Sequence, residues 1–104
     1  MILSTTDNVP GRETIQILGI SQGSTVRARS VGRDITAVFK SLIGGEISEY
    51  TILLAKSRDQ AIERMVMDAE DLGADAIINV RFQTAMVMQG CSEILAYGTA
   101  VKLG

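Results

Sequence analysis

Three sulfur-bearing side chains lie close together near the end of the chain: Met86, Met88 and Cys91. Thioether and thiolate sulfurs are the ligands that soft ions such as Cu(I) prefer. Two methionines spaced two apart on a strand point to the same side, and Cys91 follows just after a turn predicted at 89–90. The three residues are therefore a candidate soft-metal site. In the alternative interpretation the methionines fill gaps between layers and the cysteine is a small turn residue.

The chain contains no histidine, the commonest metal ligand and a frequent general base. A mononuclear zinc or copper(II) site is therefore not expected. Hydroxyl and thiol groups are present, but no base is evidently placed to activate them. We predict a non-enzymatic protein with no catalytic residue. The side chains that could act as nucleophiles are Ser4, Thr5, Thr6, Cys91 and Tyr97. A third hypothesis, after the two non-enzymatic ones, is an enzyme that uses Thr5, Thr6, Glu46 or the acidic cluster at the end of the long helix.

Four carboxylates gather where a long predicted helix ends: Asp68, Glu70, Asp71 and Asp75. Carboxylates at this end oppose the helix dipole. Such a group can mark a cation site with oxygen ligands, but the spacing matches no known calcium loop. A solvated surface is the favoured interpretation.

Two further positions leave alternatives open. Gly44-Gly45-Glu46 precedes the long helix, whose free N–H groups can hold an anion, although a tight turn between helices is favoured. Arg81 interrupts the apolar alternation of its strand together with Asn79. It either pairs with Glu93 on the neighbouring strand, at an interface between subunits, or lies on the solvent-facing edge.

Composition restricts the class of protein. The 104 residues make one domain, 1–104. Ten basic and twelve acidic residues give a net charge of −2 with no basic block, so no nucleic-acid partner is expected. No apolar run approaches the ~18 residues that a membrane span requires. One cysteine cannot form an internal disulfide, which favours a reducing cytoplasm.

The periodicity predicts an α+β fold with a two-layer arrangement: an antiparallel sheet of about four strands, one long helix and one short helix. In 13–30 the glycines Gly19 and Gly23 predict a break, either a bulge or a turn. A capping box at Ser57 would allow the long helix to begin there, but we favour a continuous helix with Ser48 as its N-cap. The expected elements are an edge strand over 1–6, a turn at 8–11, β structure over 13–30, helices over 34–43 and 48–72, and strands over 76–88 and 92–103. The strand over 76–88 can contain a bulge.

The long helix and the last strand predict the core. One helix face carries Leu54, Arg58, Ala61, Met65, Ala69 and Leu72, with Arg64 and Asp68 paired on the exposed side. Both sides of the last strand are largely apolar, which indicates burial on both sides. One helix layer covers one side only. With 46% apolar residues, we therefore expect a second layer or a neighbouring subunit on the other side.

The chain resembles the YbjQ-like family, small bacterial and archaeal proteins labelled "putative heavy-metal-binding". The resemblance covers nearly the whole chain and includes Ser4-Thr5-Thr6, Leu18-Gly19-Ile20, 44–46, 61–65, Gly73–Phe82 and Ala96–Val101. It implies a homo-oligomeric ring, a pentamer, of two-layer α+β subunits, and carries no ligand set. The predicted function is an oligomeric binding module whose ligand lies at subunit boundaries or along the ring axis, with a soft heavy-metal ion as the candidate. The alternative is a partner-binding scaffold ring without a small ligand.

Overall fold

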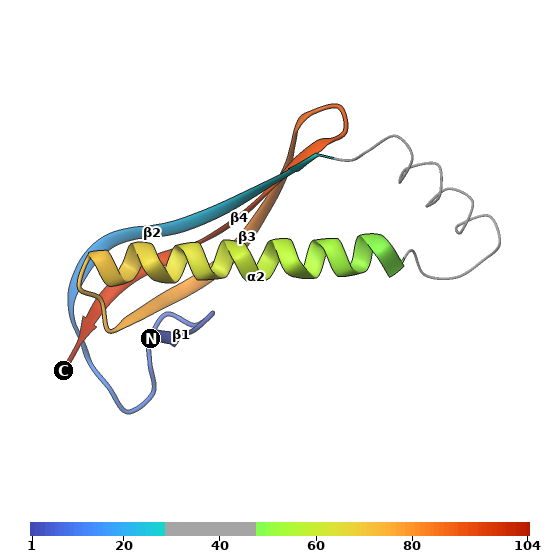
Figure 1. Ribbon diagram of the computed structural model, residues 1–104. Helices are drawn as coiled ribbons and strands as arrows, with labels where there is room; N and C mark the ends of the chain where they lie inside the picture. Colours follow the sequence, from blue (N-terminus) through green and yellow to red (C-terminus); the bar gives the residue numbers. More distant parts are fainter. Residues whose placement is uncertain (29–47) are drawn as a thin grey trace.

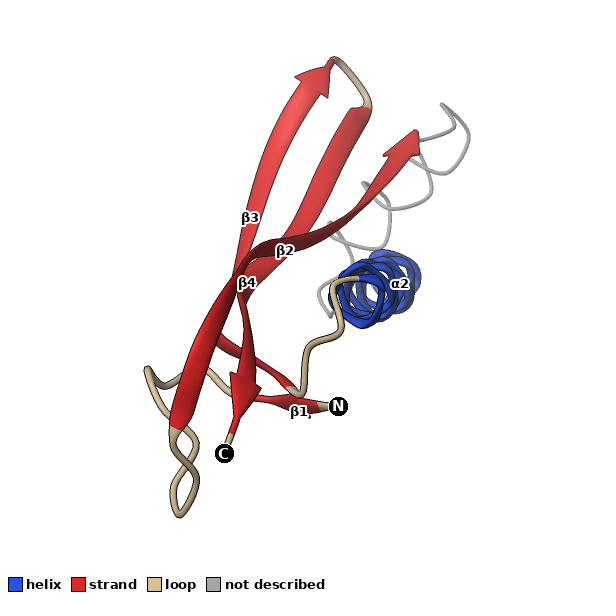
Figure 2. Ribbon diagram, turned by 90° about the vertical axis from the view of Figure 1, so that its left-hand side faces the viewer, coloured by secondary structure: helices blue, strands red, loops and turns tan. Residues whose placement is uncertain are grey.

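The computed structural model describes residues 1–28 and 48–104. A four-stranded sheet has the order β1-β3-β4-β2, and one helix, α2, lies against one of its faces (Figures 1 and 2). The predicted helix over 34–43 and the turn at 44–46 lie outside the described residues. The elements are β1 (Ile2–Leu3), β2 (Thr14–Ala28), α2 (Ser48–Asp71), β3 (Ala76–Met88) and β4 (Cys91–Leu103).

The sheet is mixed, so the prediction of a purely antiparallel sheet is wrong at one strand. β1 runs parallel to β3, with Ile2 opposite Ala76 and Leu3 opposite Ile77, while β2 and β3 both run antiparallel to β4. Parallel neighbours need a long connection rather than a hairpin. β2 and α2 both lie between β1 and β3 in the chain, so no tight turn imposes an antiparallel direction on β1.

β2 is one strand of 15 residues. Of the two predicted breaks, the bulge is confirmed: Gly19 has a φ of 135° and the register with β4 shifts between Ile17 and Gly19. A turn around Ser21–Gly23 does not form, because these residues continue the ladder with β4. Gly23 serves another purpose. A Cβ atom there would collide with the α2 backbone at Ala61, Arg64 and Met65, so this glycine lets the helix approach the strand.

α2 is a continuous helix that begins at Ser48, as predicted, and ends within one residue of the expected boundary. Ser57 lies inside it and donates a hydrogen bond to the Leu53 carbonyl at 2.8 Å. The helix ends at Gly73, whose φ is 78°. Gly73 N donates to the Glu70 carbonyl and Ala74 N to the Ala69 carbonyl, the paired bonds of a Schellman motif.

The core between helix and sheet is built around one stripe of α2. Ala61, Met65 and Ala69 are fully buried. Leu54 and Leu72, predicted on this face, are 49% and 41% exposed. Leu54 lies about two turns before Ala61 and Leu72 about one turn after Ala69. Both lie beyond the turns from Ser57 to Ala69, whose inner side chains are buried. The main cluster consists of Ala61, Met65, Ala69, Ile77, Ile94, Ala96 and Ala100.

The two sides of β4 differ in how they are covered. Ile94, Ala96 and Ala100 lie buried on the α2 side, as predicted. On the other side, here called the far face, Val101 and Leu103 are buried in a second cluster that includes Val9. Residues 95, 97 and 99 of the far face are only half-buried. Among the described residues, the far face is therefore covered at one end only.

Candidate functional site

The predicted sulfur cluster lies at the tip of the β3–β4 hairpin, the orange loop at the top of Figure 1. Gly90 makes the turn with a φ of 75°. Met88 is paired with Cys91 and Met86 with Ser92, with a register shift between the two methionines. Met86 and Met88 are 74% and 67% exposed, and Cys91 is half-buried.

This register limits what one hairpin can offer a metal. Directly paired residues share a face of the sheet, and neighbouring pairs face opposite sides. The shift therefore interrupts the common side expected for Met86 and Met88, and it leaves Met88 and Cys91 as the cross-strand pair. Their thioether and thiol suit a soft ion, but they are two donors only. Within 1–28 and 48–104, no three His, Cys, Asp or Glu side chains gather as a metal-binding group.

Two of the four carboxylates predicted at the end of the long helix, Asp68 and Asp75, bind different partners. Asp68 accepts a hydrogen bond from Gln22 N at 3.0 Å, and Asp75 accepts one from Leu103 N at 2.9 Å. Asp68 thus fastens the helix to the outer edge of β2, whereas Asp75 fastens the start of β3 to the end of β4. These two acids have structural partners, which agrees with the absence of a metal-binding group among the described residues.

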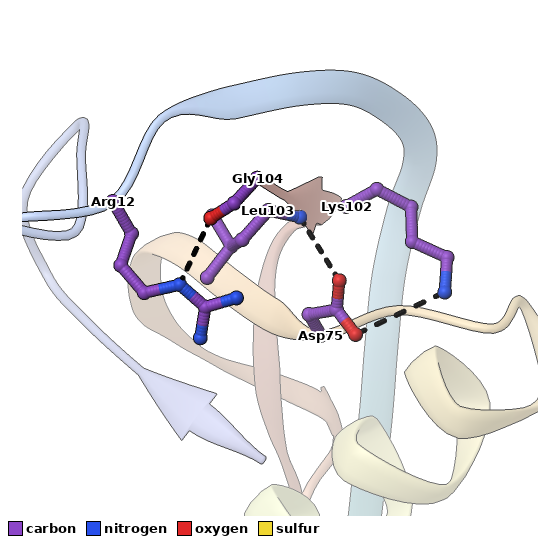
Figure 3. A network of polar contacts seen from close by, with 5 residues as sticks. All are labelled: Arg12, Asp75, Lys102, Leu103 and Gly104. Atoms are coloured by element: carbon purple, nitrogen blue, oxygen red, sulfur yellow. Dashed lines mark hydrogen bonds and ion pairs between the residues drawn. The ribbon is translucent and has the colours of Figure 1, made fainter.

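Asp75 is the centre of a polar network at the chain terminus (Figure 3). Its other carboxylate oxygen lies 3.8 Å from Lys102 Nζ, and Arg12 Nε donates to the Gly104 carbonyl at 3.2 Å. The hydrogen bond from Leu103 N lowers the pKa of Asp75 below its ordinary value, and the charges of Lys102 and Arg12 lower it further, against an opposing effect of desolvation. The network holds the C-terminal end of β4 in place.

Arg81 holds the N-terminal segment rather than an acidic side chain. Its guanidinium donates to the Thr5 carbonyl at 2.9 Å. Register places Arg81 opposite Tyr97 and Glu93 opposite Ala85, so the predicted pair with Glu93 does not form within one chain. Asn79, two residues before Arg81, has a φ of 53° and lies at the bulge of β3 between Ile78 and Arg81.

Two of the candidate nucleophiles have structural hydrogen bonds. Ser4 Oγ and Thr6 Oγ1 are 2.5 Å apart, and Thr6 Oγ1 also donates to the Asn8 carbonyl at 2.7 Å. Asn79 N and Val80 N donate to the carbonyls of Thr6 and Ser4. Both hydroxyls therefore fix the fold of the segment that lies along β3.

A hollow of about 480 Å³, which the sequence analysis missed, opens beside β2 and β4. Arg64 reaches it from α2, and its guanidinium donates to the Ser24 carbonyl at 2.5 Å. Arg64 was predicted on the exposed side of the helix in an ion pair with Asp68, but both side chains bind the β2 backbone. Only the packing of the helix on β2 brings these residues together, so local sequence carries no signal for them. The lining residues are Gln22, Gly23, Ser24, Arg64, Glu93 and Leu95.

No helix among the described residues combines the length and apolarity needed to cross a membrane. A solved structure has the same fold: a protein of unknown function from Pediococcus pentosaceus, described as a member of the DUF74 family, superposes with a TM-score of 0.72. The alignment covers 100% of this chain and 98% of that one, at 18% identity. It therefore supports the α+β fold alone.

Relatives in sequence are much nearer. The UPF0145 protein of Methanoculleus marisnigri is 58% identical over 103 residues, which make up 99% of this chain and 96% of the relative. That of Methanosarcina acetivorans is 53% identical and covers 99% and 97%. The YbjQ family model, described as "Putative heavy-metal-binding", matches residues 1–104. The chain belongs to the YbjQ family, as its sequence motifs predicted.

Proposed function

We propose that this protein is a non-enzymatic, self-associating binding module that holds a small ligand, in the first instance a soft heavy-metal ion, where subunits meet. The observation that carries the proposal is the amount of apolar surface left uncovered in one chain. Ile15, Ile17 and Ile20 on β2 are 63–73% exposed. A protein that remained a single chain would rarely leave such residues side by side in water.

The second exposed group supports the placement of the ligand. The large apolar side chains of β3 are exposed from the middle of the strand to the hairpin tip. They are Phe82, Met86, Val87 and Met88. Because Met88 and Cys91 supply only two sulfur donors, the same pair from another copy would complete a coordination shell of soft ligands. The family description is consistent with this proposal. We further propose a ring of five subunits, as the family resemblance implies, and a location in the cytoplasm.

The first experiment measures the assembly by light scattering coupled to gel filtration. We expect a mass several times that of one chain at micromolar concentration. A clean monomer under these conditions would refute the proposal, because one hairpin alone provides two soft donors.

The second experiment measures uptake of Cu(I), Zn²⁺ and Cd²⁺ by the wild type and by the Cys91→Ser and Met88→Leu variants. Met67→Leu is the matched control, because Met67 is also exposed but lies on α2, away from the hairpin. We expect both hairpin variants to lose Cu(I) uptake and the control to keep it. Equal uptake by all four proteins would exclude Met88 and Cys91 as ligands. An assembled protein that takes up none of the ions would favour the alternative, a scaffold ring that binds protein partners.

A further inference from the structure

The hollow beside β2 and β4 opens on the far face of the sheet. Ser21 of β2 is buried and its Oγ donates to the Met65 carbonyl of α2. Successive side chains of a strand point to opposite faces, so Gln22 and Ser24 lie on the far face, where Ser24 is paired with Leu95. The hollow measures about 480 Å³, within the range of roughly 300–1,000 Å³ that is usual for small-molecule sites.

Two opposite charges line this hollow without neutralising each other. Arg64 reaches it from α2 and Glu93 from β4. Among the side chains that the structure describes, the only ion pair joins Lys102 to Asp75, so the Arg64 guanidinium and the Glu93 carboxylate do not pair. Glu93 is half-buried, and a carboxylate that has lost part of its hydration gains from a cationic partner. The hollow therefore offers one positive and one negative group to a ligand.

The backbone of β2 adds a donor beside Arg64. Gln22 N donates to the Asp68 carboxylate, and the Ser24 carbonyl accepts from the Arg64 guanidinium. Both groups therefore point away from β4. Because the N–H and C=O of one residue point to the same side of an antiparallel ladder, the Ser24 N–H also points outward. A guanidinium and a backbone N–H side by side are donors that suit a carboxylate.

We propose that the hollow binds a small zwitterion, a molecule with one carboxylate and one ammonium group, such as a free amino acid or a dipeptide. The ligand carboxylate accepts hydrogen bonds from the Arg64 guanidinium and the Ser24 N–H, and the ligand ammonium donates to the Glu93 carboxylate. Leu95 supplies the apolar part of the wall. The hollow shares no residue with the proposed soft-metal site, so this inference goes beyond that function and does not depend on it.

The two charges favour a zwitterion over simpler ligands. An inorganic anion would be attracted by Arg64 but repelled by Glu93, and a metal cation would meet the reverse. A wholly apolar molecule would displace water from both charged groups without replacing its hydrogen bonds. A ligand with both charges avoids each of these penalties.

Isothermal titration calorimetry with three peptides separates the two charged contacts. Glycyl-leucine carries both charges, its N-acetyl derivative lacks the ammonium, and its C-terminal amide lacks the carboxylate. We expect the wild-type protein to bind glycyl-leucine about tenfold more tightly than either derivative, because each derivative loses one charged hydrogen-bonded contact. Equal binding of the three peptides, or binding of none, would overturn the proposal.

Two variants assign each charge to its side chain. Arg64→Gln should lose the preference for glycyl-leucine over its amide and keep the preference over its N-acetyl derivative, and Glu93→Gln should do the reverse. A variant with a disturbed fold would instead weaken all three peptides alike. The matched controls are Arg58→Gln and Glu63→Gln, which replace exposed charges of α2 outside the hollow and should keep wild-type affinities. If Arg64→Gln or Glu93→Gln retains both preferences, the assignment is wrong.

Two further measurements fix the position of the ligand and separate the two proposals. In ¹⁵N-labelled protein, glycyl-leucine should shift the amide resonances of Ser24 and Leu95; shifts confined to other residues would overturn the inference. Cys91→Ser should bind glycyl-leucine as the wild type does, and Arg64→Gln should keep Cu(I) uptake. Loss of dipeptide binding in Cys91→Ser would place the ligand at the hairpin tip and overturn the assignment to the hollow.

Discussion

Replacement of Gly23 by alanine tests how α2 is seated on the sheet. The new Cβ atom would lie 2.7 Å from the Arg64 carbonyl carbon and closer still to Met65 N and the Ala61 carbonyl oxygen. These are backbone atoms of a helix and cannot rotate away as a side chain would. Since carbon atoms pack at about 3.5–4.0 Å, α2 must withdraw from β2 by about 1 Å.

The expected cost follows from this withdrawal. Overpacking of a core costs about 1–3 kcal/mol. Withdrawal of the helix also strains the bond from Ser21 Oγ to the Met65 carbonyl, 2.6 Å, and the bond from Gln22 N to Asp68, each of which contributes about 1 kcal/mol. We therefore expect the free energy of unfolding to fall by about 3–5 kcal/mol, a large part of the stability of a domain this size.

Equilibrium urea unfolding at a fixed subunit concentration measures this loss, because the proposed assembly would make stability depend on concentration. Gly104→Ala is the control. Its Cβ would meet only the end of the Ile15 side chain at 3.2 Å and the Glu13 carbonyl oxygen at 3.8 Å, so we expect a change within about 0.5 kcal/mol. A loss below about 1 kcal/mol for Gly23→Ala would refute the close seating of the helix on β2.

Three further predictions concern single side chains. The pKa of Asp75 is lowered in the folded protein, so its stabilisation is fully present above the unfolded pKa and is lost as the pH falls through the folded value. The difference in unfolding free energy between wild type and Asp75→Asn should be constant from about pH 5 to 8, begin to shrink as the pH falls through about 4, and disappear only below the lowered folded pKa; a difference that grows in acid would contradict this. Thr25 Oγ1 is buried and has no hydrogen-bond partner within the described ranges 1–28 and 48–104, so Thr25→Val should stabilise the protein by about 1 kcal/mol in urea unfolding. Ser21→Ala should have the opposite effect, a loss of about 1–3 kcal/mol, because the buried Met65 carbonyl loses its donor; equal signs for these two variants would refute the hydrogen-bond assignment.

Sequence patterns predicted the bounds of those helices and strands that depend on their own residues alone. The strand over 76–88 has the predicted bounds, and the long helix and the last strand differ from prediction by one residue at one end each. Gly73 and Gly90 both adopt the positive φ that a helix end and a hairpin turn require. The alternation of β4 on the α2 side followed from the period of a strand, which fixes which residues share a face.

Sequence patterns predicted the candidate site less completely than the secondary structure. Met86, Met88 and Cys91 were found as soft donors from residue type, but which of them pair depends on a register shift near the hairpin turn. Arg64, Asp68 and Arg81 each bind a backbone atom of a segment 40 or more residues away in sequence. Spacing along the chain suggested nearby charges instead, because a local pattern contains no information about a distant backbone.

The sequence by itself determined the long helix, the two C-terminal strands, the helix end at Gly73 and the membership of the YbjQ family, since each depends on neighbouring residues or on the order of motifs. The tertiary structure alone decided the parallel direction of β1, the use of Gly23 as a contact with α2, and the burial limits that leave Leu54 and Leu72 exposed. These features depend on which distant surfaces meet. Periodicity specifies the face that an element buries, whereas the extent of the opposing layer determines how much of that face is covered.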